Sequence, residues 1–261
     1  MNAAVEWCLT GPDVLADLDD IPRFPPIERP LPPAGGPLSG PLGRRFEQRW
    51  RAYFDHHPDW TVLAADQPIR DGGRTLGAPD LIVARGAAVW HLELAVKFYL
   101  CRPDRSGAAL ADWVGPSVRD RLDKKVTRTR THQLPLLDQP AAKTWLQARG
   151  LPTPTHRGAV MKGVLFAHAD SLRHPEMAAA QPAGQWCTLE MLSSMVPEAS
   201  VLTRDQWLGA PPPKPQSGAA LHAAVAAALA AHPSHAVQLS ASGRRWFVVG
   251  PRWLADVAEM D

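Results

Sequence analysis

The chain has 261 residues, enough for one large or two small domains with a substantial buried core. Its 45% hydrophobic and 21% charged residues are typical of a globular protein and exclude a disordered chain, and no apolar run approaches the roughly 20 residues of a membrane span. The N-terminus lacks a basic start and an apolar core, so we expect a cytoplasmic protein without a membrane partner. A net charge of +2 does not separate a nucleic-acid binder from a neutral enzyme.

Proline shapes the first 40 residues. A short helix is predicted over residues 5–18 with an interruption near Pro12, and the Pro-rich stretch 21–41 is predicted to be a surface connector because proline lacks an amide donor and fixes φ. The next helix is indicated by Phe46, Trp50, Tyr53 and Phe54 at helical spacing. Ser39 is a candidate cap upstream of it, and Pro58 ends it.

Three strands are predicted next, over residues 60–70, 78–84 and 88–100, with a Gly-rich turn at 71–77 between the first two. A second helix is predicted over residues 119–134 and a fourth strand over 159–169. After the Pro-rich segment 210–215, an Ala-rich helix at 218–231, a hairpin around residues 241–244 and a closing helix are expected. The three cysteines show no CxxC spacing and are expected to be reduced and buried.

This order predicts an α/β (α+β) fold, with a mixed sheet flanked by helices. We divide the chain into an N-terminal helix and Pro-rich arm (residues 1–40), a core (41–170) and a C-terminal α+β extension packed on the core (171–261).

The strand at residues 88–100 carries the candidate site. Its even positions are apolar and are expected to pack against a helix, whereas His91, Glu93 and Lys97 share the opposite face. Asp80, directly after Pro79, begins the neighbouring antiparallel strand and so comes beside Glu93. Two close carboxylates repel unless a divalent cation lies between them, and oxygen ligands suit Mg²⁺ or Mn²⁺. With Lys97 to orient water or stabilise charge on phosphate, this group predicts phosphodiester hydrolysis.

The blocks LGRRFEQRWRAYFDHHPDW, APDLIV, WHLELAVKFYL and WVGPSVRDRLDKKVTRTRTHQLPL resemble the bacterial family called domain of unknown function 1853, and the resemblance covers nearly the whole chain. The family is regarded as a distant branch of the PD-(D/E)XK nuclease-like superfamily. The resemblance therefore implies a restriction-endonuclease-like core of helix, three-strand meander, helix and strand.

Carried over by position, Pro79 and Asp80 look like the PD pair and Lys97 like the motif lysine. The resemblance makes Glu47 an additional acid near the metal, and makes Lys125 and Gln133 substrate-contacting groups. One position departs from the pattern.

The superfamily places its second acid two residues before the lysine, where this chain has Ala95. The nearest acid, Glu93, has its Cα roughly 13 Å from that of Lys97 on an ideal strand. Either the acid has moved along the strand or the metal site is degraded.

The helix at residues 119–134 is basic and includes Arg121, Lys125 and Arg128, which could contact a phosphate backbone or simply form a solvated face. His91 is a candidate neighbour of the metal ligands, although an interior hydrogen-bonded histidine is the more common case. Asp80 could merely cap a turn, and Glu93 and Lys97 could form a solvated salt bridge.

The function predicted from these patterns is a Mg²⁺- or Mn²⁺-dependent nuclease acting on DNA, or on RNA. The alternative is a catalytically inactive nuclease-like module that binds nucleic acid or a protein partner, and Ala95 favours it. A structural domain with a polar groove is the third interpretation.

Overall fold

The computed structural model describes residues 3–16, 18–27, 40–170 and 183–260. The chain forms two compact units, each built from three segments. The first unit comprises Met1–Gly11, Asp19–Val96 and Val126–Lys162, and the second comprises Pro12–Leu18, Lys97–Lys125 and Gly163–Asp261. No helix in the described part of the chain is long and apolar enough to cross a membrane.

The elements of the first half of the chain are mostly short, apart from one helix and one strand. They are α1 (Ala3–Thr10), α2 (Leu42–His56), β1 (Thr61–Ala65), β2 (Ile69–Asp71), β3 (Arg74–Gly77), β4 (Leu81–Arg85), β5 (Ala88–Cys101), η1 (Leu110–Asp112), β6 (Trp113–Val114), α3 (Leu122–Arg128), the π-helical turn η2 (Thr129–Gln133), η3 (Leu136–Asp138) and α4 (Pro140–Gln147). The second half begins with the long strand β7 (His156–His168) and continues with β8 (Gly184–Thr188), α5 (Leu192–Met195), β9 (Glu198–Val201), η4 (Arg204–Leu208), β10 (Gln216–Ser217), α6 (Gly218–Ala231), β11 (Val237–Ala241), β12 (Arg244–Val249) and α7 (Pro251–Ala258).

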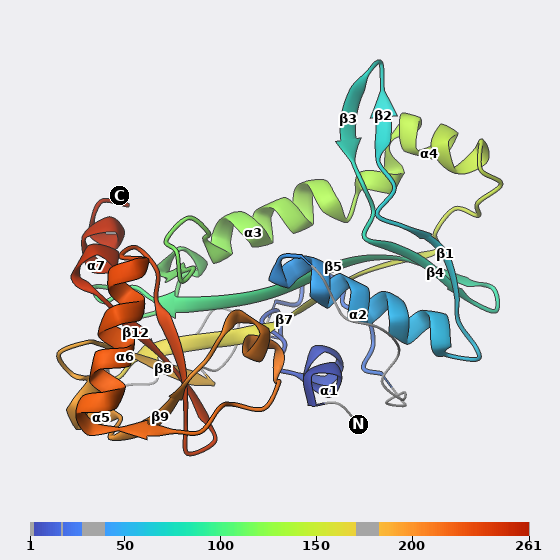
Figure 1. Cartoon of the computed structure of the whole chain (residues 1–261). Helices are drawn as coiled ribbons and strands as arrows, with labels where there is room; N and C mark the ends of the chain where they lie inside the picture. Colours follow the sequence, from blue (N-terminus) through green and yellow to red (C-terminus); the bar gives the residue numbers. More distant parts are fainter. Residues whose placement is uncertain (1–2, 17, 28–39, 171–182, 261) are drawn as a thin grey trace. The chain divides into compact units, whose positions relative to one another are not determined.

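The strands form one large mixed sheet in the order β1-β4-β5-β7-β8-β12-β11-β9-β10 (Figure 1). The pairs β1–β4 and β4–β5 are antiparallel, whereas β7–β8 and β8–β12 are parallel. Strands β2 and β3 form a separate two-stranded hairpin, which stands beside α4 in Figure 1. The predicted mixed α/β fold, with a sheet flanked by helices, is confirmed.

In the first unit, the two faces of β5 pack against different helices. On the even-numbered face the ring of Trp90 contacts Phe24, which in turn contacts Trp50 and Phe54 of α2. On the odd-numbered face Val89 belongs to a buried cluster that includes Trp145 of α4. A strand buried on both faces is central in its sheet, so any polar side chain on it must find a partner inside the protein.

In the second unit, the predicted Ala-rich helix α6 packs its larger apolar side chains against the sheet. Leu221, Val225 and Leu229 of α6 pack against Leu239 of β11 and Val248 of β12. The β11–β12 hairpin turns at Ser242 and Gly243, both with positive φ, which is the backbone that two-residue hairpin turns require.

Several sequence predictions agree with the structure. The helix at α2, the β1-β4-β5 meander, the strand at β7, and the Ala-rich helix, hairpin and closing helix of the tail are all confirmed. All three cysteines are free and buried, as expected.

Other predictions were wrong in detail. The strand expected at residues 60–70 stops at Ala65, because Asp66 has a positive φ of 48° and turns the chain. The Gly-rich segment then forms the tip of the separate β2–β3 hairpin. The helix expected to begin at residue 119 begins at Leu122. Residues 28–39 of the predicted connector, including Ser39, lie outside the described part of the chain.

Candidate polar site on strand β5

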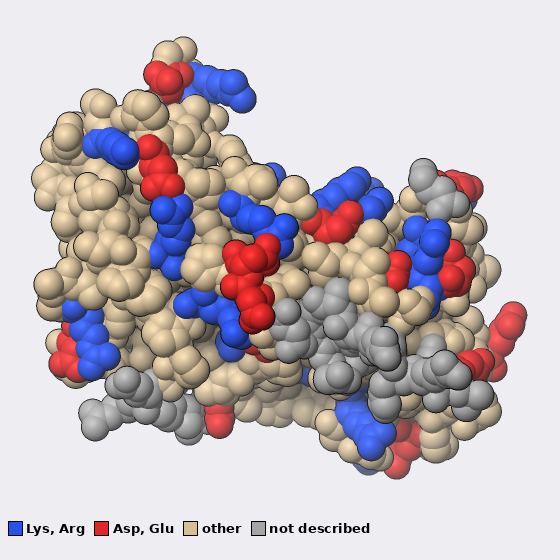
Figure 2. Space-filling model, turned by 180° about the vertical axis from the view of Figure 1, so that it is seen from behind, with Lys and Arg blue, Asp and Glu red and all other residues tan. Residues whose placement is uncertain are grey.

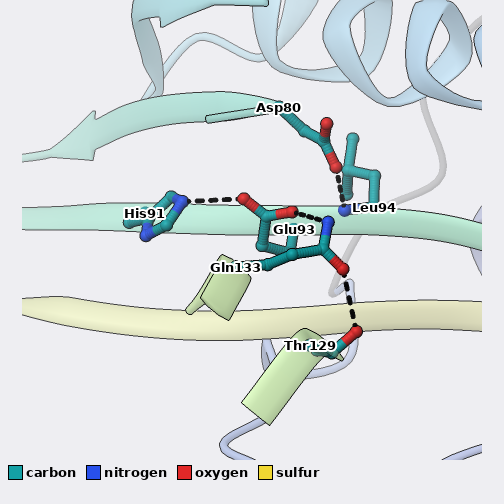
Figure 3. Close-up of polar contacts among 6 residues, drawn as sticks. All are labelled: Asp80, His91, Glu93, Leu94, Thr129 and Gln133. Atoms are coloured by element: carbon teal, nitrogen blue, oxygen red, sulfur yellow. Dashed lines mark hydrogen bonds and ion pairs between the residues drawn. The ribbon is translucent and has the colours of Figure 1, made fainter. Parts of the chain in front are cut away.

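Glu93 lies at the centre of a buried hydrogen-bonded network in the first unit (Figure 3). Its side chain is 2% exposed, and both of its carboxylate oxygens accept hydrogen bonds. Nε2 of His91 donates to Oε1 at 3.0 Å, and Nε2 of Gln133 donates to Oε2 at 2.6 Å. The hydroxyl of Thr129 donates to Oε1 of Gln133 at 3.0 Å, which fixes the orientation of the Gln133 amide.

The contact with Glu93 determines the tautomer of His91. A carboxylate only accepts hydrogen bonds, so Nε2 of His91 carries the proton. His91 is 1% exposed, and its Nδ1 has no hydrogen-bond partner among the described residues. A second proton on Nδ1 would therefore be a buried donor without an acceptor among the described residues.

Asp80 lies just before β4 and is held by a different contact. Its Oδ2 accepts a hydrogen bond of 2.7 Å from the backbone nitrogen of Leu94. The register that pairs Leu81 with Leu92 brings Asp80 beside Glu93, as predicted. The two carboxylates nevertheless point to different partners: that of Asp80 to the backbone of Leu94, and that of Glu93 to His91 and Gln133 (Figure 3).

Lys97 belongs to the second unit, where its partner is Asp120. Lys97 Nζ donates to Oδ2 of Asp120 at 2.5 Å, and the two side chains are 27% and 40% exposed. The pKa of Tyr99 is raised well above its usual range, first by burial and then by the charge of Asp120. Asp120 was not predicted as a site residue. It lies 23 residues from Lys97 in the sequence, and no local pattern indicates a pair at that separation.

The remaining predicted acid, Glu47, lies on α2. That helix packs on the Trp90 side of β5, and Glu93 belongs to the opposite set of side chains along the strand. Glu47 is partly buried and has a partner of its own in the protein.

The basic residues of the segment at 119–130 fall into two groups. Arg121 forms a two-point ion pair with Asp123, Arg130 pairs with Asp20, and Lys125 also has a partner in the protein. Arg119, Lys124 and Arg128 are exposed and make no ion pair with any described residue, and the last two stand four residues apart on α3. On the face shown in Figure 2, by comparison, basic side chains mostly stand beside acidic ones and form no continuous basic area.

The nuclease-like resemblance implies a Mg²⁺ or Mn²⁺ ion, and the residues present do not fit one as they are arranged. Such an ion needs free carboxylate oxygens at short distance, but both oxygens of Glu93 are bound and excluded from solvent. Within the described ranges, no three His, Cys, Asp or Glu side chains are grouped in a way that could hold a metal ion.

The sequence placed Gln133 and His91 near the site, and His91 is the interior hydrogen-bonded histidine that was one of its two interpretations. Gln133 was expected to contact substrate, and in the structure its amide nitrogen binds Glu93. Thr129 was not predicted. The sequence offers only a weak signal for it, a threonine four residues before Gln133 in a predicted helix, and its burial is seen only in the structure.

Comparison with known proteins adds one match. No curated protein matches the chain, and no solved structure matches it. The family model described as domain of unknown function (DUF1853) matches residues 13–245, which is most of the chain. The chain therefore belongs to the DUF1853 family.

Proposed function

We propose that this chain is a catalytically inactive nuclease-like module that binds nucleic acid, with DNA favoured over RNA. The observation that carries the proposal is the state of Glu93: both of its oxygens are occupied by His91 and Gln133 inside the protein. A carboxylate that is 2% exposed and fully hydrogen-bonded supports the fold, and it is not available to a metal or to water.

Two further features support the loss of catalysis. Ala95 occupies the position at which the superfamily pattern has its second acid. Lys97, at the position of the motif lysine, is paired with Asp120. An amine held by a carboxylate carries less net charge toward a phosphate than a free amine does.

Binding is assigned to the exposed face of α3. Lys124 and Arg128 lie on one side of this helix and form no ion pair with any described residue, so a phosphate backbone could approach both. Arg121 is held by Asp123, and its guanidinium is less available for the same purpose. Phosphate contacts of this kind give affinity without sequence specificity.

The test is the salt dependence of binding to labelled double-stranded DNA, single-stranded DNA and RNA, measured by fluorescence anisotropy in EDTA. Each phosphate contact contributes about 0.9 to the slope of log K against log salt concentration on double-stranded DNA, and about 0.7 on single strands. The double variant Lys124→Gln/Arg128→Gln should therefore reduce this slope by about 2 on double-stranded DNA and weaken binding to all sequences equally.

A matched control removes the same charge elsewhere. Arg51 and Arg252 are exposed and each lies in a helical ion pair, with Asp55 and Asp256 respectively. The double variant Arg51→Gln/Arg252→Gln should leave the slope unchanged. Equal effects of the two double variants would show that only net charge matters and would reject α3 as the contact surface.

A metal-dependent nuclease is the second candidate, favoured by the position of Asp80 beside Glu93 on adjacent strands. For that activity Gln133 and His91 would have to release Glu93 when substrate binds. Cleavage that needs Mn²⁺ or Mg²⁺ and is lost in both Asp80→Ala and Glu93→Gln would support this candidate against the first.

A further inference from the structure

The second unit contains a pocket of about 480 Å³, separate from the polar residues of β5. It lies between η4, the C-terminal end of α6 and the beginning of β11, and its walls include Leu202, Ala228 and Val237. This volume is within the range of pockets that bind small molecules. Apolar walls with a few polar groups are the usual composition of such sites.

Gln238 is the unusual residue of this pocket. It lines the pocket, it is 1% exposed, and neither its Oε1 nor its Nε2 has a hydrogen-bond partner among the described residues. Its backbone is satisfied, because its carbonyl accepts a hydrogen bond from the backbone nitrogen of Leu202 at 2.9 Å. Buried amides without partners are rare in native proteins, and a turn of this side chain toward the pocket would present a donor and an acceptor side by side.

Nitrogen-bearing side chains gather at the same pocket. Arg204 lines it and makes no ion pair with any described residue, and its guanidinium lies 5.5 Å from the ring of Trp207. The rings of His232 and His235 are 5.7 Å apart and also line it. The pKa of His235 is lowered first by burial and then by the nearby positive charges of Arg204, His232 and Arg119.

We propose that this pocket binds a nucleoside monophosphate, with the phosphate at Arg204, His232 and His235 and an edge of the base on the side-chain amide of Gln238. Guanidinium and imidazole donors suit phosphate oxygens. A glutamine amide pairs with the adjacent donor and acceptor of a base, as it does with adenine in DNA recognition. The proposal is independent of the nucleic-acid surface on α3, since it uses none of the same residues.

The shared chemistry, a base with a 5′-phosphate, could come from a free nucleotide or from the end of a strand. Isothermal titration calorimetry with AMP, GMP, CMP and UMP tests the first source, and a 5′-phosphorylated oligonucleotide tests the second. The same titrations with adenosine and with inorganic phosphate test each half of the ligand. At least one monophosphate should bind at a single site, with a Kd at least about tenfold lower than that of the nucleoside or of inorganic phosphate. A 5′-phosphorylated oligonucleotide that binds more tightly than the same strand without its 5′-phosphate would assign the site to strand ends, because the surface on α3 would hold both strands alike.

Two variants and one control complete the test. Arg204→Gln changes an exposed side chain and should weaken monophosphate binding about tenfold, as should Gln238→Met, which keeps the side-chain shape. Arg244→Gln removes an exposed charge on β12 that does not line the pocket and should leave binding unchanged. No binding of any monophosphate at millimolar concentration, or equal binding by wild type and Arg204→Gln, would overturn the proposal.

Discussion

Replacing Glu93 distinguishes a structural carboxylate from a metal ligand. In Glu93→Ala, Nε2 of His91 and Nε2 of Gln133 each lose their acceptor, and His91 then has two unpartnered ring nitrogens. Hydrogen bonds to a charged group contribute about 1.5 to 3 kcal/mol each, so the loss of two should lower the free energy of unfolding by about 3 to 6 kcal/mol.

Glu93→Gln is the milder variant, because it removes the charge of Glu93 and keeps one acceptor oxygen. Its amide oxygen can still accept from one partner, while its amide nitrogen meets the donor of the other. A neutral histidine can relieve the conflict by moving its proton to Nδ1, which leaves that proton buried without an acceptor. The loss should therefore be smaller, about 1 to 2 kcal/mol.

The assay is urea unfolding followed by far-ultraviolet circular dichroism, in EDTA and again in millimolar MgCl₂. We expect both losses to be the same in the two buffers. A metal ligand gives the opposite pattern, because removing one of two repelling carboxylates does not destabilise the metal-free protein. Wild-type stability in Glu93→Ala without metal, together with Mg²⁺-dependent stabilisation of the wild type alone, would refute the structural role.

Gly163→Ala should lower the free energy of unfolding by at least about 3 kcal/mol or prevent folding, because the added Cβ would lie 1.7 Å from the carbonyl oxygen of Lys97. The control is Gly43→Ala on α2, whose Cβ would meet no atom closer than 3.9 Å and should be tolerated. Urea unfolding compares the two variants. Burial lowers the pKa of His168, and the charge of Asp170 opposes this effect only in part. The neutral ring therefore contributes fully to the stability of the fold above about pH 6.5, and this contribution is lost as the pH falls through the lowered pKa. When the pH is lowered from 7 to 5, the free energy of unfolding of His168→Gln should therefore fall less steeply than that of the wild type. Burial raises the pKa of Cys8, Cys101 and Cys187 to about 12, so a thiol reagent at pH 8 should modify them only after denaturation; rapid labelling of the folded protein would contradict this.

Local patterns in the sequence were sufficient to predict much of the fold. The aromatic residues of α2 recur at helical spacing, and the alternation along β5 identifies one long strand, since each pattern depends on neighbours within a few residues. The early end of β1 was missed. It depends on a positive φ at Asp66, where the apolar run 62–65 gives way to Gln67 and Pro68, a turn signal to which the strand prediction gave too little weight.

The sequence was sufficient to predict which residues of β5 belong to the candidate site, but it did not predict the contacts that these residues make. Periodicity placed His91 and Glu93 on one face of the strand, and the structure agrees. The contact with Gln133 joins residues 40 positions apart, and no local pattern reveals it. The burial of Glu93 is equally non-local, because it depends on the packing of the odd-numbered face of β5 beneath segments later in the chain.

The most direct test of the account measures binding and cleavage in the same reactions. End-labelled single- and double-stranded DNA and RNA are incubated with purified protein in EDTA, Mg²⁺ or Mn²⁺, and each reaction is divided between a native gel and a denaturing gel. Asp80→Ala and Lys97→Ala are run beside the wild type. The account predicts retarded and intact nucleic acid in all three buffers. Metal-dependent cleavage by the wild type that both variants lose, or the absence of any retarded species, would contradict it.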